Sequence, residues 1–229
     1  MSCAVMQPYF LPYIGYWQLI DAVDTFVIFD DVNYFKKGFI NRNSILLNGE
    51  PFSFTLELVK ASQNKLINEI EVGNNKEKIL KNITSAYMKA PYYNDVYPLI
   101  EKIVLNDEKN LAVYIGDSLQ DVAAYLEINT RFIYSSLVSQ TPGLKAQDKI
   151  IDICQNLNQK RYINAIGGQD LYSKQRFREK RIKLSFLETE RFSYIQNGEQ
   201  FVPYLSIIDV LMFNSNLQIK EMLNFYTLK

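Results

Sequence analysis

The first thirty residues contain an apolar strand, a helix-forming segment and a second apolar strand, and this pattern constrains the fold more than any other feature. Residues 3–7 and 25–29 are short, largely apolar runs, and residues 14–23 place apolar side chains at helical spacing. A continuous apolar strand after a helix is typical of a parallel sheet that is covered on both faces. The segment therefore predicts a βαβ unit.

The rest of the chain predicts a hairpin, then helices, then a return to alternating strands and helices. Asn48-Gly49 is a favoured turn pair between two strand-like runs. Residues 66–72 fit either a short strand or the start of a helix. The expected hairpin strands are 44–47 and 52–56, and the expected helices are 76–89, 93–105, 110–126, 145–157, 173–180 and a closing helix at 205–213. The expected later strands are 130–136, 161–166 and, as the last one, 183–188. We predict an α/β fold with a mostly parallel sheet flanked by helices, an attached β-hairpin and a helical insertion, in one domain of residues 1–229.

Charge and cysteine content exclude several classes of protein. The chain has 25 Lys+Arg against 25 Asp+Glu, so its net charge gives no basis for non-specific nucleic-acid binding. No apolar run approaches the roughly 18 residues that span a bilayer, and no signal-peptide pattern is present. Cys3 and Cys154 provide neither a disulfide framework nor a zinc site, and both are expected in the core. We expect a cytoplasmic protein with no membrane span and no nucleic-acid partner.

The absence of histidine restricts the chemistry further. The chain contains no histidine, so a Ser-His-Asp triad, a Cys-His nucleophile and a His-ligated zinc are all excluded. Any proton transfer must use Asp, Glu, Lys, Tyr, Cys or a group on the substrate.

The first candidate cluster follows the first predicted strand. It comprises Gln7, Tyr9, Tyr13, Gly15 and Tyr16, at the strand end and in the first turn of the next helix, where open α/β sheets bind ligands. Free N–H groups near Gly15 can hold an anion. The tetrad that begins at Tyr13 has the spacing of the His-x-Gly-His nucleotide motif, with tyrosine at both histidine places. The alternative is that the prolines and aromatic residues here only cover the core.

The second candidate cluster follows the second predicted strand. Asp30 and Asp31 could accept an amine proton, bind sugar hydroxyls or ligate Mg²⁺. The residues after them include Asn33, Lys36, Lys37, Arg42 and Asn43, of which the basic ones suit phosphate groups. The alternative is a solvated surface loop. If the cluster is functional, it and the tyrosine cluster should open into one cavity above neighbouring strands.

Two weaker motifs lie nearer the C-terminus. Gly167, Gly168 and Gln169 follow another predicted strand, and the two glycines permit close approach of a ligand, although a plain turn is the favoured explanation. Ser206 and Asp209 are spaced like a capping box, which favours a structural role at the start of a helix.

Several motifs together resemble the WbqC-like protein family. The residues that carry the resemblance are 6–16, Phe29-Asp30-Asp31-Val32-Asn33-Tyr34, Ile40-Asn41-Arg42-Asn43, Ala90-Pro91-Tyr92-Tyr93, 166–172 and 201–209. They occur in order over nearly the whole chain. Many relatives have histidines in the first motif, where this chain has Gln7 and tyrosines.

The resemblance implies a role in making O-antigen or another bacterial surface polysaccharide, because family members occur in the gene clusters for these polymers. A glycine transferase role has been suggested for some of them. The leading hypothesis is therefore acylation of the amine of a nucleotide- or lipid-linked amino sugar, with glycine as a candidate acyl group. Asp30 or Asp31 would act as base or amine anchor, Arg42 would hold a diphosphate, and backbone N–H groups near Gly15, with Tyr13 or Tyr16, would polarise the carbonyl.

Two alternatives remain open at this point. One is nucleotidyl transfer or adenylate formation in the same pathway, which requires ATP and Mg²⁺. The other is a non-catalytic sugar-nucleotide-binding protein. Apart from that Mg²⁺ ion, no cofactor is expected.

Overall fold

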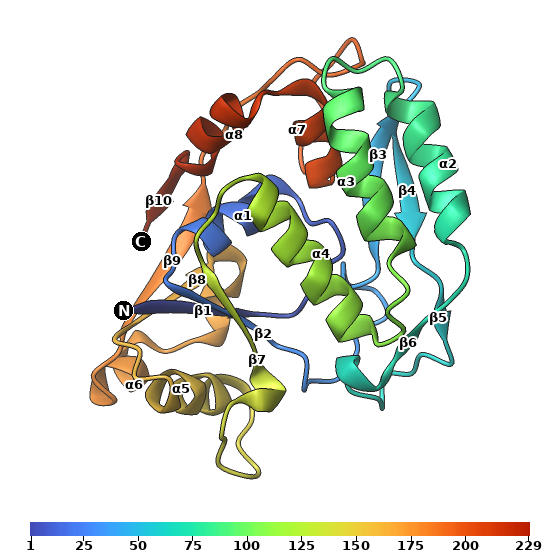
Figure 1. The fold of residues 1–229 in the computed structure, drawn as a ribbon. Coiled ribbons are helices and arrows are strands. Elements are labelled where there is room, and N and C mark those ends of the chain that lie inside the picture. The colour runs from blue at the N-terminus through green and yellow to red at the C-terminus, as the bar shows by residue number, and fades with distance from the viewer.

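The computed structural model describes residues 1–229, and its centre is a six-stranded sheet in the order β10-β9-β8-β1-β2-β7 (Figure 1). Neighbouring strands are parallel throughout, except that β10 is antiparallel to β9. The bounds are Ser2–Met6 for β1, Thr25–Ile28 for β2, Arg131–Tyr134 for β7, Arg161–Ala165 for β8, Lys183–Thr189 for β9 and Tyr226–Leu228 for β10. The predicted α/β fold with a mostly parallel sheet is confirmed.

The predicted βαβ unit is formed by β1, helix α1 (Ile14–Asp21) and β2. The two strands pair in parallel from Cys3 opposite Thr25 to Met6 opposite Ile28. The chain adds β7 beyond β2, whereas β8 pairs with the other side of β1 and β9 follows β8. The strand order therefore reverses between β1 and β8, and open α/β sheets bind their ligands at such a position.

Helices cover both faces of the sheet because successive residues of a strand point to opposite sides. Ala4 of β1 belongs to the core cluster that contains Trp17 of α1. The neighbouring Cys3 faces the other way, with its Sγ 3.5 Å from Sγ of Cys154, and both cysteines are free and buried, as predicted. The other helices that flank the sheet are α4 (Leu111–Tyr125), α5 (Ala146–Asn156) and α6 (Lys174–Glu179).

The long connection between β2 and β7 contains the predicted hairpin and helical insertion. Asn48 and Gly49 have φ angles of 54° and 81°, as a two-residue hairpin turn requires. Residues 66–72, which the sequence left undecided, form a single 3-10 turn, Ile67–Glu69, followed by a two-residue strand. The elements of this connection before α4 are β3 (Arg42–Leu47), β4 (Glu50–Thr55), β5 (Leu58–Val59), β6 (Glu71–Val72), α2 (Lys76–Tyr87) and α3 (Tyr93–Leu105).

The C-terminal prediction was wrong in two respects. The helix predicted as the last one, α7 (Ile207–Phe213), is followed by α8 (Asn216–Leu223), which starts with a capping box formed by Ser215 and Gln218. The chain then adds β10 at the edge of the sheet. The strand predicted at residues 183–188 is therefore present, as β9, but it is not the last strand of the chain. No helix has the length and apolar content that crossing a bilayer requires.

Candidate functional site

The two candidate clusters both lie at carboxyl ends of parallel strands, but at different places on the sheet edge. The sheet is strongly twisted, so that β9 ends toward α8 whereas β7 ends beside α5 (Figure 1). Tyr13 and Gly15 lie against the end of β9. Asp30 and Asp31 contact residues that follow β7.

A pocket of about 460 Å³ lies between the N-terminus of α1, the end of β9 and the segment before α7. Aromatic rings form much of its wall: the ring centroids of Tyr13 and Tyr204 are 6.0 Å apart, and those of Tyr194 and Phe201 are 5.2 Å apart. The other lining residues are Ile14, Thr189, Glu190, Arg191, Phe192, Pro203, Leu205 and Val210. We call this the aromatic pocket.

The aromatic pocket does not contain both predicted clusters. Tyr13 lines it, whereas Gln7, Asp30, Asp31 and Arg42 do not. The pocket is thus not the shared cavity expected from the sequence, because Tyr13 lies against the end of β9, which β8 and β1 separate from β2 in the sheet.

The start of α1 is built around Tyr13 and Gly15. Tyr13 is the N-cap residue, with φ −66° and ψ 163°, and no side chain caps the first turn, so the first N–H groups have no side-chain acceptor. A Cβ at residue 15 would lie 2.4 Å from Cε2 of Tyr13 and 2.7 Å from Oγ1 of Thr189. Glycine therefore allows Tyr13 and β9 to pack this closely against α1. Burial, followed by the neighbouring Tyr204 and Tyr9, raises the pKa of Tyr13, so its hydroxyl keeps its proton and can donate.

Tyr16 lies between α1 and the sheet and Tyr9 packs against it, so neither lines the pocket. The Tyr16 hydroxyl donates to the backbone carbonyl of Gln7 at 2.8 Å, and Tyr16 is 3% exposed. The ring centroids of Tyr9 and Phe26 each lie 5.4 Å from that of Tyr16. Burial raises the pKa of Tyr16 well above its ordinary value. Gln7 is half-buried at the end of β1, and its side chain makes no hydrogen bond within the protein.

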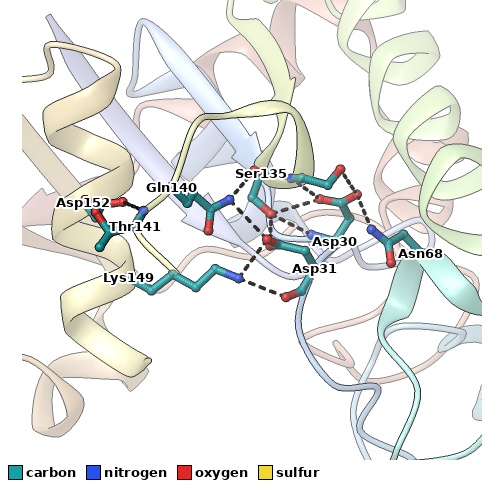
Figure 2. A network of polar contacts seen from close by, with 9 residues as sticks. Asp30, Asp31, Asn68, Ser135, Gln140, Thr141, Lys149 and Asp152 are labelled. Carbon is teal, nitrogen blue, oxygen red and sulfur yellow. Dashed lines mark hydrogen bonds and ion pairs between the residues drawn. The ribbon is translucent and has the colours of Figure 1, made fainter. Parts of the chain in front are cut away.

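The carboxylate of Asp30 is buried and accepts hydrogen bonds on both oxygens (Figure 2). Its Oδ1 accepts from the Ser135 hydroxyl and the Ser136 N–H, both at 2.9 Å. Its Oδ2 accepts from the Ser136 hydroxyl at 2.6 Å and from Nδ2 of Asn68 at 3.1 Å. Asp30 therefore ties the end of β2 to the turn after β7 and to the insertion.

Asp31 is paired with Lys149 of α5 (Figure 2). Nζ of Lys149 lies 2.8 Å from Oδ2 of Asp31, and Gln140 donates to the same oxygen at 3.1 Å. Ser135 donates to Oδ1. Burial alone would raise the pKa of Asp31, but Lys149, Ser135 and Gln140 together outweigh it, so the pKa lies below its ordinary value. No group of three His, Cys, Asp or Glu side chains is placed to hold a metal ion.

The basic residues after Asp31 lie in an exposed loop and at the first position of β3. Lys36 and Lys37 are exposed. Nε of Arg42 donates to the Gly38 carbonyl at 2.9 Å, and its NH2 donates to the Lys37 carbonyl at 2.5 Å. The guanidinium group thus binds two backbone carbonyls of the loop, whereas the sequence had suggested that it binds a phosphate.

The two asparagines of this cluster also bind backbone carbonyls. Exposed Asn33 donates to the carbonyl of Gln63 at 2.8 Å. Buried Asn43 donates to the carbonyl of Leu11 at 2.6 Å, and so fixes the proline-bounded loop that precedes α1.

Gly167, Gly168 and Gln169 form part of a 3-10 helix directly after β8. A Cβ at residue 168 would lie 2.6 Å from Nδ2 of Asn164, whereas a Cβ at residue 167 would meet nothing within 4 Å. Gly167 and Gln169 are exposed. The packing explains glycine at 168 but not at 167.

Comparison with known proteins supports the resemblance seen in the sequence. Residues 7–221 match the WbqC-like protein family. The chain belongs to this family. It is also 25% identical over 227 residues to the uncharacterized protein Rv1507c of Mycobacterium tuberculosis, with 97% of each chain covered. No solved structure matches this WbqC-like protein.

Two residues of the aromatic pocket in this WbqC-like protein were missed from the sequence. Glu190 and Arg191 directly follow β9, and neither side chain forms a hydrogen bond or an ion pair within the protein. Open α/β sheets bind ligands at the carboxyl ends of their strands, and this rule, which selected the residues after β1 and β2, applies equally to the residues after β9. The sequence prediction ends that strand at residue 188 and assigns no role to the residues after it.

Asp209 has a different role from the predicted capping box. Ser206 does cap α7, because its Oγ accepts from the N–H two residues later. The Asp209 carboxylate instead turns inward and accepts from the hydroxyls of Tyr87 and Tyr194 and from Nε2 of Gln196, each at 2.8 Å. Burial is the main cause that raises the pKa of Asp209, although the three donors oppose it.

Proposed function

We propose that this WbqC-like protein transfers an acyl group, with glycine as the first candidate, to the amine of an amino sugar in the synthesis of a bacterial surface polysaccharide. The observation that carries the proposal is the aromatic pocket, whose volume of about 460 Å³ suits a small-molecule ligand. The pocket adjoins the end of β9 and the N-terminus of α1, on the side of the sheet where α/β proteins bind ligands.

The lining of the pocket suits a sugar. A pyranose ring presents C–H faces that pack on aromatic rings, and Tyr13, Tyr194 and Tyr204 provide such rings. Its hydroxyl groups need polar partners, and Thr189 and Glu190 lie in the same wall. Arg191 would pair with a phosphate of a nucleotide- or lipid-linked sugar.

The reaction requires a base and a group that stabilises the oxyanion. The sugar amine, freed of one proton by the Glu190 carboxylate, attacks the acyl carbonyl carbon, and the bond from that carbon to the leaving group breaks with its electron pair on the leaving group. The N–H groups of the first turn of α1 and the Tyr13 hydroxyl would donate to the carbonyl oxygen as it gains negative charge.

The base is assigned to Glu190, with Asp30 and Asp31 as the alternative proposed from the sequence. Protein groups donate to all four carboxylate oxygens of the two aspartates, whereas the Glu190 carboxylate has no partner within the protein. Substituting the residue that acts as the base should remove turnover while the protein stays folded. Separate substitutions of Glu190, Asp30 and Asp31 therefore show which of them is the base.

The test is a transfer assay with the purified protein, activated glycine and a panel of nucleotide-linked amino sugars. The expected result is an amide product, detected by mass spectrometry. Release of pyrophosphate from ATP would indicate adenylate formation instead, and thermal stabilisation by the sugar without any product would indicate a binding protein.

Two tyrosines of α1 provide a matched pair for the oxyanion role. Tyr13→Phe should lower kcat/KM by about 100-fold, because it removes a donor from the transition state. Tyr16→Phe removes a hydroxyl that binds the Gln7 carbonyl in the core, so it should cost about 1 kcal/mol of stability and leave turnover intact. Equal effects of the two variants on turnover would contradict this placement of the site.

A further inference from the structure

The loop after Asp31 combines exposed aromatic side chains with an excess of positive charge. Residues 33–43 contain Phe35, Lys36, Lys37, Phe39 and Arg42 and no acidic residue, in a chain whose net charge is zero. Phe35 is 55% exposed and Phe39 is 58% exposed, and both lysines between them are exposed as well. Two such phenylalanines in one loop are unusual for a surface that contacts only water.

The loop is held in shape by contacts at its base. The Arg42 guanidinium donates to the carbonyls of Lys37 and Gly38, and it lies 6.0 Å from the centre of the Phe39 ring. The ring centroids of Phe39 and Tyr9 are 6.1 Å apart. The loop therefore presents its aromatic and basic side chains without first having to fold around a partner.

A second basic segment lies against this loop. The Tyr34 N–H donates to the carbonyl of Lys65 at 2.9 Å, and Asn33 donates to the carbonyl of Gln63 at 2.8 Å. Residues 58–66 carry Lys60 and Lys65 and no acidic residue. The two segments are therefore neighbours, and together they carry five basic residues and no acidic one.

We propose that this surface binds an anionic lipid bilayer, with Phe35 and Phe39 inserted among the headgroups and Lys36, Lys37, Lys60 and Lys65 paired with lipid phosphates. Exposed rings at a loop tip can enter a bilayer interface, whereas base stacking on a nucleic acid requires rings along a groove that tracks the strand. The charge complementarity is local, because the chain as a whole is neutral. The proposal does not depend on the transfer reaction.

The test is co-sedimentation of the purified protein with vesicles of two compositions. One set contains phosphatidylcholine alone, and the other contains equal parts of phosphatidylcholine and phosphatidylglycerol. The protein should sediment with the anionic vesicles only. Binding should weaken strongly when salt is raised from about 0.1 M to about 1 M, because the screening length falls from about 10 Å to about 3 Å.

Two double variants separate the contributions of charge and insertion. Lys36→Glu/Lys37→Glu should weaken vesicle binding at least about 25-fold, because each lysine near an anionic surface contributes about fivefold. Phe35→Ser/Phe39→Ser should weaken it at least about tenfold through loss of apolar burial. Both variants should keep the wild-type circular dichroism spectrum. The lysine variant should also keep the wild-type Tm, whereas the phenylalanine variant loses the contacts of Phe39 with Tyr9 and Arg42 and should unfold at a slightly lower Tm.

One control makes the same charge change elsewhere, and the other removes a single exposed apolar side chain. Lys180→Glu/Lys183→Glu makes the same change in net charge near the amino end of β9, and Met88→Ser removes a side chain that is 59% exposed on another surface. Both controls should bind vesicles like wild type. The proposal is wrong if wild type fails to bind anionic vesicles, if the phenylalanine variant binds as tightly as wild type, or if an oligonucleotide is bound more tightly than the vesicles at the same salt concentration.

Discussion

The carboxylate of Asp209 accepts a hydrogen bond of 2.8 Å from the hydroxyl of Tyr194, whose ring lines the aromatic pocket. The same oxygen accepts from Gln196, which also bonds both backbone polar groups of Val202. A single buried acid thus fixes one wall of the pocket and the loop that follows it. Tyr87 of α2 donates to the other oxygen, so the wall is also tied to the helical insertion.

Removing the Asp209 carboxylate should destabilise the protein and disturb the pocket. Asp209→Ala leaves the hydroxyls of Tyr87 and Tyr194 and the amide of Gln196 without their acceptor, at an expected cost on the order of 3 kcal/mol. Asp209→Asn keeps one acceptor and should cost less. Urea unfolding measures the difference. Equal stability of Asp209→Ala and wild type would show that the three donors have other partners.

Asp209 should also make stability depend on pH in an unusual direction. Its pKa is raised above the ordinary value of 3.8, mainly by burial, so the folded state binds the proton more tightly than the unfolded state. Stability from this group is therefore fully present below pH 3.8 and is lost as the pH rises through the raised pKa. As the pH is lowered from neutral, the free energy of unfolding of wild type should therefore increase relative to that of Asp209→Asn. A constant difference between the two proteins would contradict this.

Local sequence signals predicted most of the fold because each depends on nearby residues. The apolar strands, the helical spacing and the Asn48-Gly49 turn were all recognised correctly. The strand Tyr226–Leu228 was missed, because three residues carry too little pattern and its pairing with β9 is set by the tertiary structure. Asp209 was assigned to a cap because its true partner Tyr87 lies 122 positions away in the chain.

The candidate site was only partly predictable for a similar reason. The rule that ligands bind at carboxyl ends of strands pointed to Tyr13, which lines the aromatic pocket. It could not tell that Tyr16, three residues later, faces the core, nor that Tyr13 lines a pocket at the end of β9 that does not include Asp30. Glu190 follows the same rule but required the correct end of β9.

Gly15→Ala should damage the aromatic pocket, whereas Gly167→Ala should be almost neutral. A methyl group at residue 15 would lie 2.4 Å from the Tyr13 ring and 2.7 Å from Thr189, so the ring must move or the helix must shift. The expected cost is about 1–3 kcal/mol, with loss of sugar-dependent thermal stabilisation. At residue 167 a methyl group meets nothing within 4 Å, and the change should stay within about 0.5 kcal/mol. Thermal unfolding with and without the sugar tests both, and equal effects would contradict the packing argument.

Lys149→Met should destabilise the protein at neutral pH and much less in acid. Lys149 pairs with Asp31 while both side chains are mostly buried, at 15% and 19% exposure, so losing the pair should cost about 2 kcal/mol. The pKa of Asp31 is lowered, so this stability is present above the ordinary value of 3.8 and is lost as the pH falls through the lowered pKa. Urea midpoints of the two proteins should therefore stay apart down to pH 3.8 and converge only as the pH falls through the lowered pKa. Midpoints that stay equally far apart would show that the pair does not set the pKa.

Asp30→Asn distinguishes a structural clamp from a catalytic acid. The Ser136 N–H and hydroxyl and the Asn68 amide donate to the Asp30 carboxylate, and the Ser135 hydroxyl shares its one proton between Asp30 and Asp31. An asparagine would place an NH₂ group against some of these donors, at an expected cost of about 2–3 kcal/mol. Asp170→Asn is the matched control, because Asp170 is exposed and its side chain has no partner in the protein. If Asp30 is a clamp, the folded variant retains transfer activity at a lowered Tm. If Asp30 is the base, Tm falls by the same amount but the folded variant has no turnover, which would move the reaction from the aromatic pocket to the end of β2.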